Sequence, residues 1–232
     1  MTAGVLAGLF TGYLVWGTGP RAARAQDQFA AQLNQSWRAG PPALSGAAPA
    51  GAGQDPVPAV PDRSTLVTGK PFAFLRIPAF GAQWRFTVIE GTQLAQLNVS
   101  PGHVPGTQLP GQLGNFAVAG HRVTAGNPFW ALPDLTAGDM VYVDTRYDTY
   151  AYRVLARPAW VAPTDLSVLD PVPGHLGLAP TRRLITLITC DPAWTGTQRV
   201  IVTGALESVA DRIAGTGADA RTSVPALSSR AR

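Results

Sequence analysis

The chain has 232 residues, of which 46% are hydrophobic, and its net charge of +4 comes almost entirely from arginine, since Lys70 is the only lysine. This length favours one main domain with appendages, and the scattered or terminal arginines argue against nucleic acid as a partner. A single cysteine, Cys190, excludes an intrachain disulfide, and three histidines without acidic neighbours predict no metal site and no cofactor.

Residues 1–20 carry no charge and are rich in apolar side chains, which predicts a membrane anchor or signal-anchor. A cleaved signal peptide is the second interpretation, because residues 23–25 resemble a cleavage site although no positive region precedes the apolar stretch. Arg21 and Arg24 by themselves would hold the following chain in the cytoplasm. We therefore expect that Met1 is a late start, with a basic segment upstream of it in the natural gene.

Three segments then lead into the main domain. Residues 21–38 have apolar side chains three or four apart, which predicts an amphipathic helix between the membrane and the domain. Residues 39–64 consist mainly of Pro, Ala and Gly and predict a linker. The main domain should span 65–208, and residues 209–232 predict a disordered tail.

Short apolar runs separated by Gly and Pro recur in the main domain and are typical of strands. They cover residues 71–78, 84–89, 115–121, 140–145, 150–161, 184–190 and 200–206. Two short helical windows, 93–97 and 127–135, interrupt them. Because no strands alternate regularly with long helices, we predict a mainly β domain that forms a closed or nearly closed barrel.

Cys190 ends the apolar, β-branched run 184–189, and Asp191-Pro192 then terminates the predicted strand. A cysteine at a strand end can present its sulfur at the domain surface, as a nucleophile requires. A buried packing cysteine is the structural alternative, because cysteine is among the residues most often found inside proteins. The position in the strand favours the reactive interpretation.

Two further residues can support a cysteine nucleophile. Arg199 follows a long hairpin loop and should lie opposite Cys190, where a guanidinium could stabilise a negative oxygen. His121 ends the run 115–119, and an imidazole near a thiol can raise the thiolate fraction and protonate a leaving amine. A hydrogen-bonded turn histidine and a surface arginine remain the structural alternatives. His103 and His175 lie in Pro/Gly loops and are predicted to be turn residues.

Several segments resemble one known family. Thr186-Leu187-Ile188-Thr189-Cys190 is similar to the T-L-x-T-C strand of sortases, residues 115–122 resemble the family's histidine segment, and residues 198–202 resemble its arginine strand. Further segments resemble the class E sortases of high-GC Gram-positive bacteria: residues 75–78, 88–92, 101–107 and 137–141.

The resemblance implies an eight-stranded barrel, extracellular and anchored to the cell membrane by the N-terminal segment. It implies a cysteine transpeptidase that cleaves a C-terminal sorting signal of surface proteins, L-A-x-T-G or L-P-x-T-G, between Thr and Gly. Cys190 would form a thioester with threonine, Arg199 would stabilise the oxyanion, and His121 would protonate the glycine amine. A cell-wall amine, from lipid-linked peptidoglycan or a pilin lysine, would then take the product.

Substrate contacts are expected from four residues of the same segments: Thr186, Thr189, Val104 and Arg122. The chain departs from many class E sortases in having Val104 in place of an aromatic residue and Asp191 in place of histidine. The Asp191 carboxylate should disfavour a thiolate at Cys190 unless an arginine, Arg122 or Arg199, offsets it, which predicts a slower enzyme. A cysteine peptidase that hydrolyses the same signals and an inactive peptide-binding barrel are the alternative functions.

Overall fold

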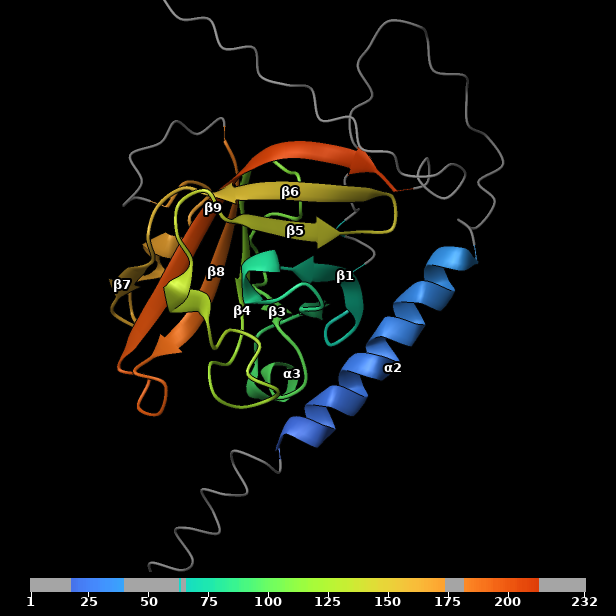
Figure 1. The fold of residues 1–232 in the computed structure, drawn as a ribbon, viewed down its shortest axis with the longest axis horizontal. Helices are drawn as coiled ribbons and strands as arrows, with labels where there is room; N and C mark the ends of the chain where they lie inside the picture. The colour runs from blue at the N-terminus through green and yellow to red at the C-terminus, as the bar shows by residue number, and fades with distance from the viewer. Residues whose placement is uncertain (1–17, 40–62, 64–65, 174–181, 213–232) are drawn as a thin grey trace, which may run out of the picture.

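The computed structural model describes residues 18–39, 63, 66–173 and 182–212 (Figure 1). Its elements are the helices α2 (Thr18–Arg38) and α3 (Leu94–Leu97), the 3-10 helices η3 (Pro78–Phe80), η4 (Leu132–Asp134) and η5 (Leu166–Leu169), and the strands β1 (Pro71–Arg76), β2 (Arg85–Glu90), β3 (Gly102–His103), β4 (Gly114–Ala119), β5 (Met140–Asp144), β6 (Asp148–Val154), β7 (Ala159–Val161), β8 (Arg183–Asp191) and β9 (Gln198–Asp211).

The strands form a closed barrel. Their order is β6-β5-β1-β2-β3-β4-β8-β9, and a further pairing of β6 with β9 closes this ring of eight, while β7 pairs with β9 outside it. Most neighbours are antiparallel, but β2–β3 and β4–β8 run parallel. Closure removes the exposed edges that an open sheet would leave. The prediction of a mainly β, eight-stranded barrel with few short helices is confirmed.

The predicted strands agree approximately with the observed ones, but the short strand β3 was not predicted, and two further segments differ locally. The run 150–161 divides into β6 and β7, because Pro158 lies between them and has no N–H group to donate to a ladder. β9 continues to Asp211, beyond the predicted end of the domain at residue 208, because its second half pairs with β6. Residues 213–232, which include most of the predicted tail, lie outside the described residues.

His103 is not the turn residue that the Pro/Gly context predicted. It belongs to the short strand β3 and is 1% exposed. Its Nδ1 lies 2.5 Å from Glu90 Oε2, and its Nε2 lies 3.0 Å from Thr107 Oγ1. This buried pair comes from residues distant in sequence, so turn propensity could not reveal it. His175 lies outside the described residues.

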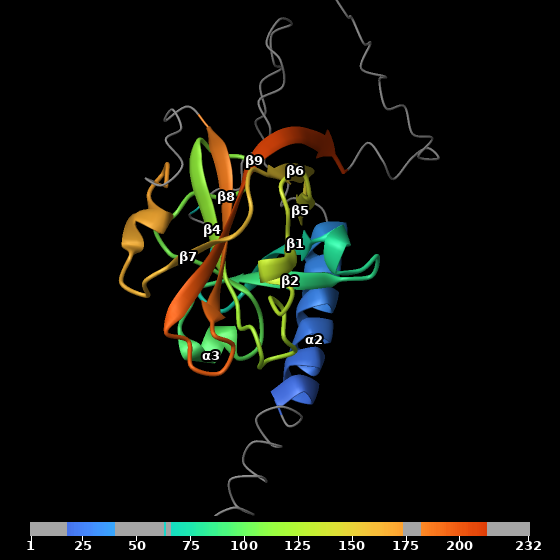
Figure 2. The ribbon, with the colours of Figure 1, turned by 60° about the vertical axis from the view of Figure 1, so that its left-hand side comes forward.

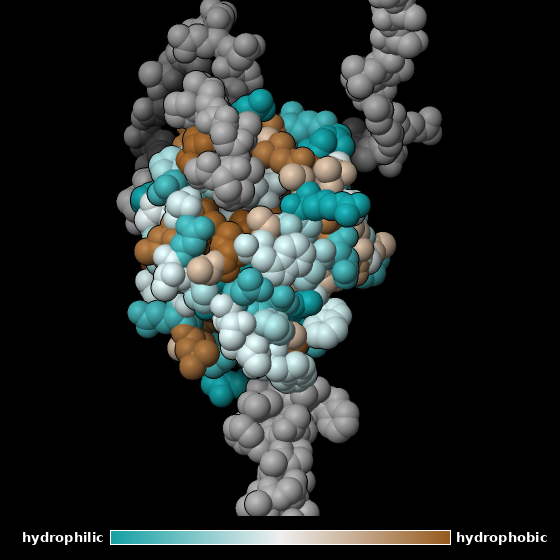
Figure 3. Space-filling view, turned by 90° about the vertical axis from the view of Figure 1, so that its left-hand side faces the viewer, coloured by the Kyte–Doolittle hydropathy of each residue, from teal (hydrophilic) through white to brown (hydrophobic). Residues whose placement is uncertain are grey.

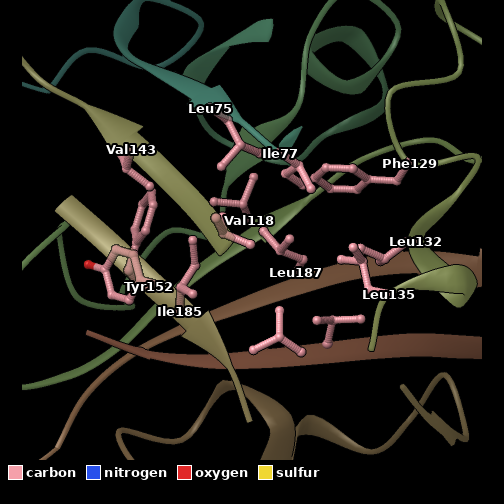
Figure 4. Packing of buried hydrophobic residues seen from close by; sticks show 14 of the residues in the cluster. Leu75, Ile77, Val118, Phe129, Leu132, Leu135, Val143, Tyr152, Ile185 and Leu187 are labelled. Atoms are coloured by element: carbon pink, nitrogen blue, oxygen red, sulfur yellow. The ribbon is translucent and has the colours of Figure 1, made fainter. Parts of the chain in front are cut away.

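The window 127–135, predicted as a helix, forms only the 3-10 helix η4. Pro128 and Pro133 each remove a backbone donor, which prevents a regular α-helix there. The apolar residues of the window instead fill the barrel interior: Phe129, Leu132 and Leu135 are almost completely buried and point toward Val118 and Leu187 (Figure 4). The spacing of the apolar residues in this window therefore results from packing in the core and not from a helix. The other window, 93–97, does contain a helix, α3.

Helix α2 covers the residues predicted as an amphipathic helix, and it packs against the barrel beside β1 and β2 (Figure 2). Ala22 and Leu33 are buried, and Trp37 makes an edge-to-face contact with Phe74, with ring centroids 5.4 Å apart. Gln26 accepts a hydrogen bond from Thr87 N at 2.7 Å and donates one to Val99 O at 3.0 Å. These contacts make α2 part of the domain surface.

Among the described residues, no helix is both long and apolar enough to cross a bilayer. The predicted anchor at 1–20 lies outside the described residues up to residue 17, and its last residues begin helix α2. Most of the predicted linker at 39–64 also lies outside them. The membrane anchor therefore stays a prediction.

We expect the Gln26→Leu substitution to lower the free energy of unfolding by about 1–3 kcal/mol, because it leaves the buried Thr87 N–H group without its acceptor. Urea unfolding with an unchanged dependence on denaturant would measure this loss. The Gln28→Leu substitution on the exposed side of α2 is the matched control and should change stability by less than about 0.5 kcal/mol. Equal effects of the two substitutions would show that docking of α2 does not depend on Gln26.

Candidate active site

The strand register aligns the three residues that sequence analysis selected. In the parallel β4–β8 ladder the last pair is Ala119 with Ile188, and Gly120 N donates to Ile188 O at 3.0 Å. Continuing this register sets His121 level with Cys190. On the other side of β8, Cys190 pairs directly with Arg199 in the antiparallel β8–β9 ladder. The three residues thus form one row across neighbouring segments.

This row lies on the outer face of the barrel. Ile185 and Leu187 of β8 belong to the hydrophobic core. Because side chains alternate between the two faces of a strand, Cys190 points to the opposite, outer face. Its thiol is half-buried and forms no disulfide. The sulfur is therefore presented at a surface while its strand remains anchored in the core, as the strand-end position predicted.

The turn between β8 and β9 packs against the cysteine. Gly196 has a φ of +61°, and a Cβ atom at this position would lie 3.7 Å from Cys190 Sγ and 3.9 Å from Arg199 Nη1. Gly196 N donates to Pro192 O at 2.8 Å, which closes the turn. Arg199 Nη1 donates to Gly196 O at 2.8 Å and to Gln198 O at 2.9 Å. These contacts hold the guanidinium group on the same side of the turn as the thiol.

His121 is held from two directions. Its Nε2 lies 3.3 Å from Asn98 Oδ1, and its carbonyl oxygen accepts a hydrogen bond from Phe129 N at 3.1 Å. Burial lowers the pKa of His121 below its ordinary value, because desolvation penalises the imidazolium ion. The imidazole is therefore mostly neutral near neutral pH and can accept a proton.

Gly120 allows the close approach of the segment that carries His121. A Cβ atom at this position would lie 2.7 Å from Phe129 Cδ2, which is closer than real side chains come. Phe129 is fully buried in the core (Figure 4). Gly120 O also accepts a hydrogen bond from Thr189 Oγ1 at 2.8 Å. The residue before the histidine and the residue before the cysteine are therefore linked directly.

The carboxylate of Asp191, the residue after the cysteine, has partners from two other segments. Asp191 forms an ion pair with Arg122 through Oδ1, and its Oδ2 accepts a hydrogen bond from Trp160 Nε1 at 2.9 Å. Arg122 also lies over the ring of Trp130, with its guanidinium carbon 5.8 Å from the ring centroid. Of the two arginines expected to offset the Asp191 carboxylate, the structure thus pairs Arg122 with it.

Of the four residues expected to contact substrate, Arg122 and Thr189 lie beside the row of candidate catalytic residues. Thr189 is 2% exposed and Thr186 is 0% exposed, so a substrate would reach either one only through other side chains. Val104 is half-buried and follows β3, where its N–H group donates to Ala117 O at 2.9 Å. Substrate contacts of these residues stay predictions.

Residues 75–207 match the family model of the sortase domain. The chain belongs to the sortase family. The matched stretch runs from β1 to β9 and contains Cys190, His121 and Arg199. Sortases are cysteine transpeptidases, and the half-buried thiol between an imidazole and a guanidinium is a constellation suited to that chemistry.

Individual relatives agree with this assignment. Sortase SrtE1 of Streptomyces coelicolor is 32% identical over 211 residues, which are 88% of this chain and 54% of the relative. The solved structure of sortase E from Streptomyces avermitilis matches with a TM-score of 0.60 and 41% identity, covering 64% of this sortase and 95% of that chain. Sortase E1 from S. coelicolor, solved with a tripeptide in the active site, matches with a TM-score of 0.60 and 34% identity, covering 65% and 96%. This sortase thus spans only about half the length of the first curated relative.

Sequence reasoning missed several neighbours of the candidate site. Asn98 ends the short helix α3 and lies beside His121 only because β3 leads the chain back to β4. Trp160 reaches Asp191 because β7 pairs with β9. Neither residue carries a local signal, since their positions depend on which strands pair. Gly196 lies in the hairpin loop before Arg199, and its positive φ and its place beside Cys190 and Arg199 could not be predicted from the loop sequence.

The pH dependence of stability should carry the signature of His121. Its folded pKa is lowered, so as the pH falls the unfolded chain binds the proton first, near about 6.5. This contribution is present above that pH and is lost as the pH falls toward the lower folded value. We expect the His121→Gln variant to lose less stability than the wild type between pH 8 and pH 5 in urea unfolding. Parallel curves for the two proteins would contradict this expectation.

Proposed function

We propose that this chain is a class E sortase that cleaves a C-terminal sorting signal between threonine and glycine and transfers the new carboxyl end to an amine. The observation that carries the proposal is the row formed by His121, Cys190 and Arg199, which the β4–β8 and β8–β9 registers set side by side. Acyl transfer through a thioester needs a nucleophile, a proton donor and a charge that stabilises an oxyanion. Each of the three residues supplies one of them.

In this proposal the neutral His121 imidazole takes the proton of the Cys190 thiol, Sγ attacks the threonine carbonyl carbon, and the carbonyl oxygen becomes negative in the tetrahedral intermediate. The Arg199 guanidinium, held by the carbonyl groups of Gly196 and Gln198, stabilises this oxygen. The intermediate collapses as the C–N bond breaks and His121 gives a proton to the leaving glycine amine. An acceptor amine then attacks the thioester and gives a proton to His121, a new amide forms, and the C–S bond breaks to release the Cys190 sulfur, which His121 can protonate again.

A peptide substrate is supported by the relative solved with a tripeptide in its active site. That relative shares 34% identity with this chain, and the chain covers 96% of it. The preference between L-A-x-T-G and L-P-x-T-G depends on side chains that contact the signal, among which we expect Val104 and Arg122. We propose surface proteins that end in such a signal as the substrates.

The orientation of α2 supports a site that faces the membrane. The N-terminal end of α2 and the end of β8 that carries Cys190 lie on the same side of the barrel (Figures 1 and 2). An anchor N-terminal to Thr18 would therefore bring Cys190 toward the outer surface of the bilayer. This geometry favours a lipid-linked cell-wall precursor as the acceptor amine, and we propose a pilin lysine as the alternative acceptor.

The test is cleavage of fluorogenic L-A-x-T-G and L-P-x-T-G peptides by the full chain, with and without an amine acceptor. A ligated product that depends on the amine and disappears in the Cys190→Ala variant is the expected result. Cleavage that is indifferent to the amine would identify the chain as a hydrolase of the same signals. No cleavage together with an unreactive thiol would favour a peptide-binding barrel without chemistry.

A further inference from the structure

Asp191 has both carboxylate oxygens occupied by partners from different segments. Oδ1 pairs with Arg122 Nη1, and Oδ2 accepts from Trp160 Nε1. The side chains of Arg122 and Asp191 are only 18% and 21% exposed, so solvent screens this pair less than it screens a surface pair. Two partners on two oxygens leave the carboxylate little freedom to rotate.

The partners of Asp191 adjoin the three candidate catalytic residues. Arg122 directly follows His121, and Asp191 directly follows Cys190. Trp160 directly precedes Val161, whose cross-strand partner is Arg199. One carboxylate therefore connects the segments that carry the nucleophile, the acid and the cation.

This connection lies just beyond the part of the barrel that backbone hydrogen bonds hold together. The β4–β8 ladder ends with Gly120 N bonded to Ile188 O, followed by the side-chain bond from Thr189 Oγ1 to Gly120 O. The next contact between the two segments is the Arg122–Asp191 pair. Small displacements of reacting groups reduce rates strongly, so contacts that fix the relative position of two segments at a reaction centre matter for turnover.

The same pair controls the charge around the thiol. At the end of the barrel that carries Cys190, the charged and titratable groups of the neighbouring segments are His121 and Arg122 after β4, Asp191 on β8 and Arg199 on β9. Strand β7 contributes the neutral Trp160, and Asn98 after α3 is also neutral. A carboxylate alone would disfavour a thiolate, but Arg122 compensates it, so Arg199 can act on the thiol and on the oxyanion.

We propose that Asp191 and Arg122 form a positioning pair that holds the His121 segment against the Cys190 segment and cancels the carboxylate charge beside the thiol. This proposal rests on the proposed function for its effect on turnover, whereas its effect on the thiol can be measured without any substrate. Of the two arginines that sequence analysis expected to offset the Asp191 carboxylate, the proposal assigns this role to Arg122.

The surface around Asp191 and Arg122 bears on whether the pair could bind a partner protein. The face on the side of β7 shows small hydrophobic patches among polar residues (Figure 3). Trp160 is 47% exposed, yet its indole N–H group is committed to Asp191. The described contacts of Asp191 therefore point inward to the site and not outward to a partner.

A double-mutant cycle tests the positioning role with the full chain. Asp191→Asn removes the carboxylate charge and leaves one acceptor oxygen for the two N–H donors of Arg122 and Trp160, and Arg122→Met removes the cation while keeping much of the side-chain volume. We expect each single variant to lower kcat about 10-fold with KM little changed, because the pair orients catalytic groups and does not bind substrate. The double variant should be no worse than the poorer single variant, because both lose the same contact. Independent losses that multiply in the double variant would overturn the positioning role.

The matched control is the Arg153–Glu207 pair between β6 and β9. Its nitrogen–oxygen distance is 2.7 Å, but its side chains are 50% and 44% exposed, and it lies away from the row of candidate catalytic residues. We expect Glu207→Gln to leave kcat within about twofold of the wild type, as for other exposed ion pairs. A loss at Glu207→Gln equal to that at Asp191→Asn would reveal a general effect of ion-pair removal and overturn the proposal.

Alkylation of Cys190 provides a readout that needs no substrate, and the single cysteine makes it specific. Arg122→Met leaves the carboxylate uncompensated, so alkylation at pH 7 should slow about 3- to 10-fold and its pH profile should move to higher pH. Asp191→Asn keeps the cation, so its alkylation should not slow. Equal rates for Arg122→Met and the wild type would overturn the charge role. If the wild type alkylates normally but cleaves no sorting peptide, the proposed function is contradicted. The charge role is then still decided by comparing the alkylation rates of the wild type and the Arg122→Met variant.

Discussion

The Cys190→Ala substitution is expected to reduce amine-dependent transfer of a sorting peptide by at least about 1,000-fold, because no other residue in the chain can form the thioester. The thiol is half-buried at the end of β8, and its strand is held by the neighbouring strands β4 and β9. Removal of one sulfur atom at this outer position should leave the barrel intact. Product formation by quenched-flow or fluorescence assays measures the loss.

A Cys190→Ser variant separates chemistry from packing. Serine keeps the shape of the side chain but lacks a readily ionised nucleophile, so it should be nearly as inactive as alanine. Circular dichroism and urea unfolding should show both variants folded. Retention of more than a tenth of the wild-type rate by either variant would rule out Cys190 as the nucleophile.

The second large effect is expected at Arg199, where substitution by alanine should lower kcat about 100- to 1,000-fold, as loss of an oxyanion-stabilising group does. The guanidinium group has no formal partner in an ion pair among the described residues; its Nη1 atom instead donates to the carbonyl groups of Gly196 and Gln198. It is therefore positioned by neutral groups that leave its positive charge uncompensated. Because the oxyanion exists only in the transition state and intermediate, KM should change little.

Lysine and a remote arginine are the controls for this prediction. Arg199→Lys keeps the charge but loses the planar guanidinium group, whose Nη1 atom donates to both carbonyl groups, so we expect only part of the activity to return. Arg153→Ala removes a half-exposed arginine from β6 and should leave turnover unchanged. If Arg199→Lys matched the wild type, charge alone and not the held geometry would account for the role of Arg199. If Arg199→Ala raised KM with kcat unchanged, Arg199 would bind substrate and would not stabilise the oxyanion.

Much of the barrel could be predicted because its strands leave local signals. The run 184–190 is apolar and β-branched, and its observed strand β8 covers Arg183–Asp191. The division of 150–161 at Pro158 also follows from a local property, the missing N–H group of proline. The prediction of a helix at 127–135 was wrong because apolar residues three or four positions apart fit an irregular segment that fills the core as well as a helix. Two prolines in that window were the contrary signal.

The neighbours of the candidate site could be predicted only in part. Cys190 and Arg199 flank one hairpin, so the connection between two consecutive strands was enough to set them opposite each other. His121 is distant in sequence, and only the parallel pairing of β4 with β8 sets it level with Cys190. His103 was misjudged for a related reason, since its partner Glu90 lies on another strand. Pairings between distant strands leave no periodic trace in either strand alone.

By itself, the sequence determined the class of the domain, the approximate positions of most strands and the candidate chemistry, because apolar β-branched runs, the Gly and Pro residues between them and a lone cysteine at a strand end are local properties. The tertiary structure decided what depends on distant contacts: the closure of the ring by β6 and β9, the docking of α2 through Gln26, and the partners of Asp191. Asp191 illustrates the difference, since beside the thiol it predicted an unfavourable charge. In the structure the same carboxylate binds Arg122 and Trp160, which come from two other segments, and so connects the segments of the candidate site.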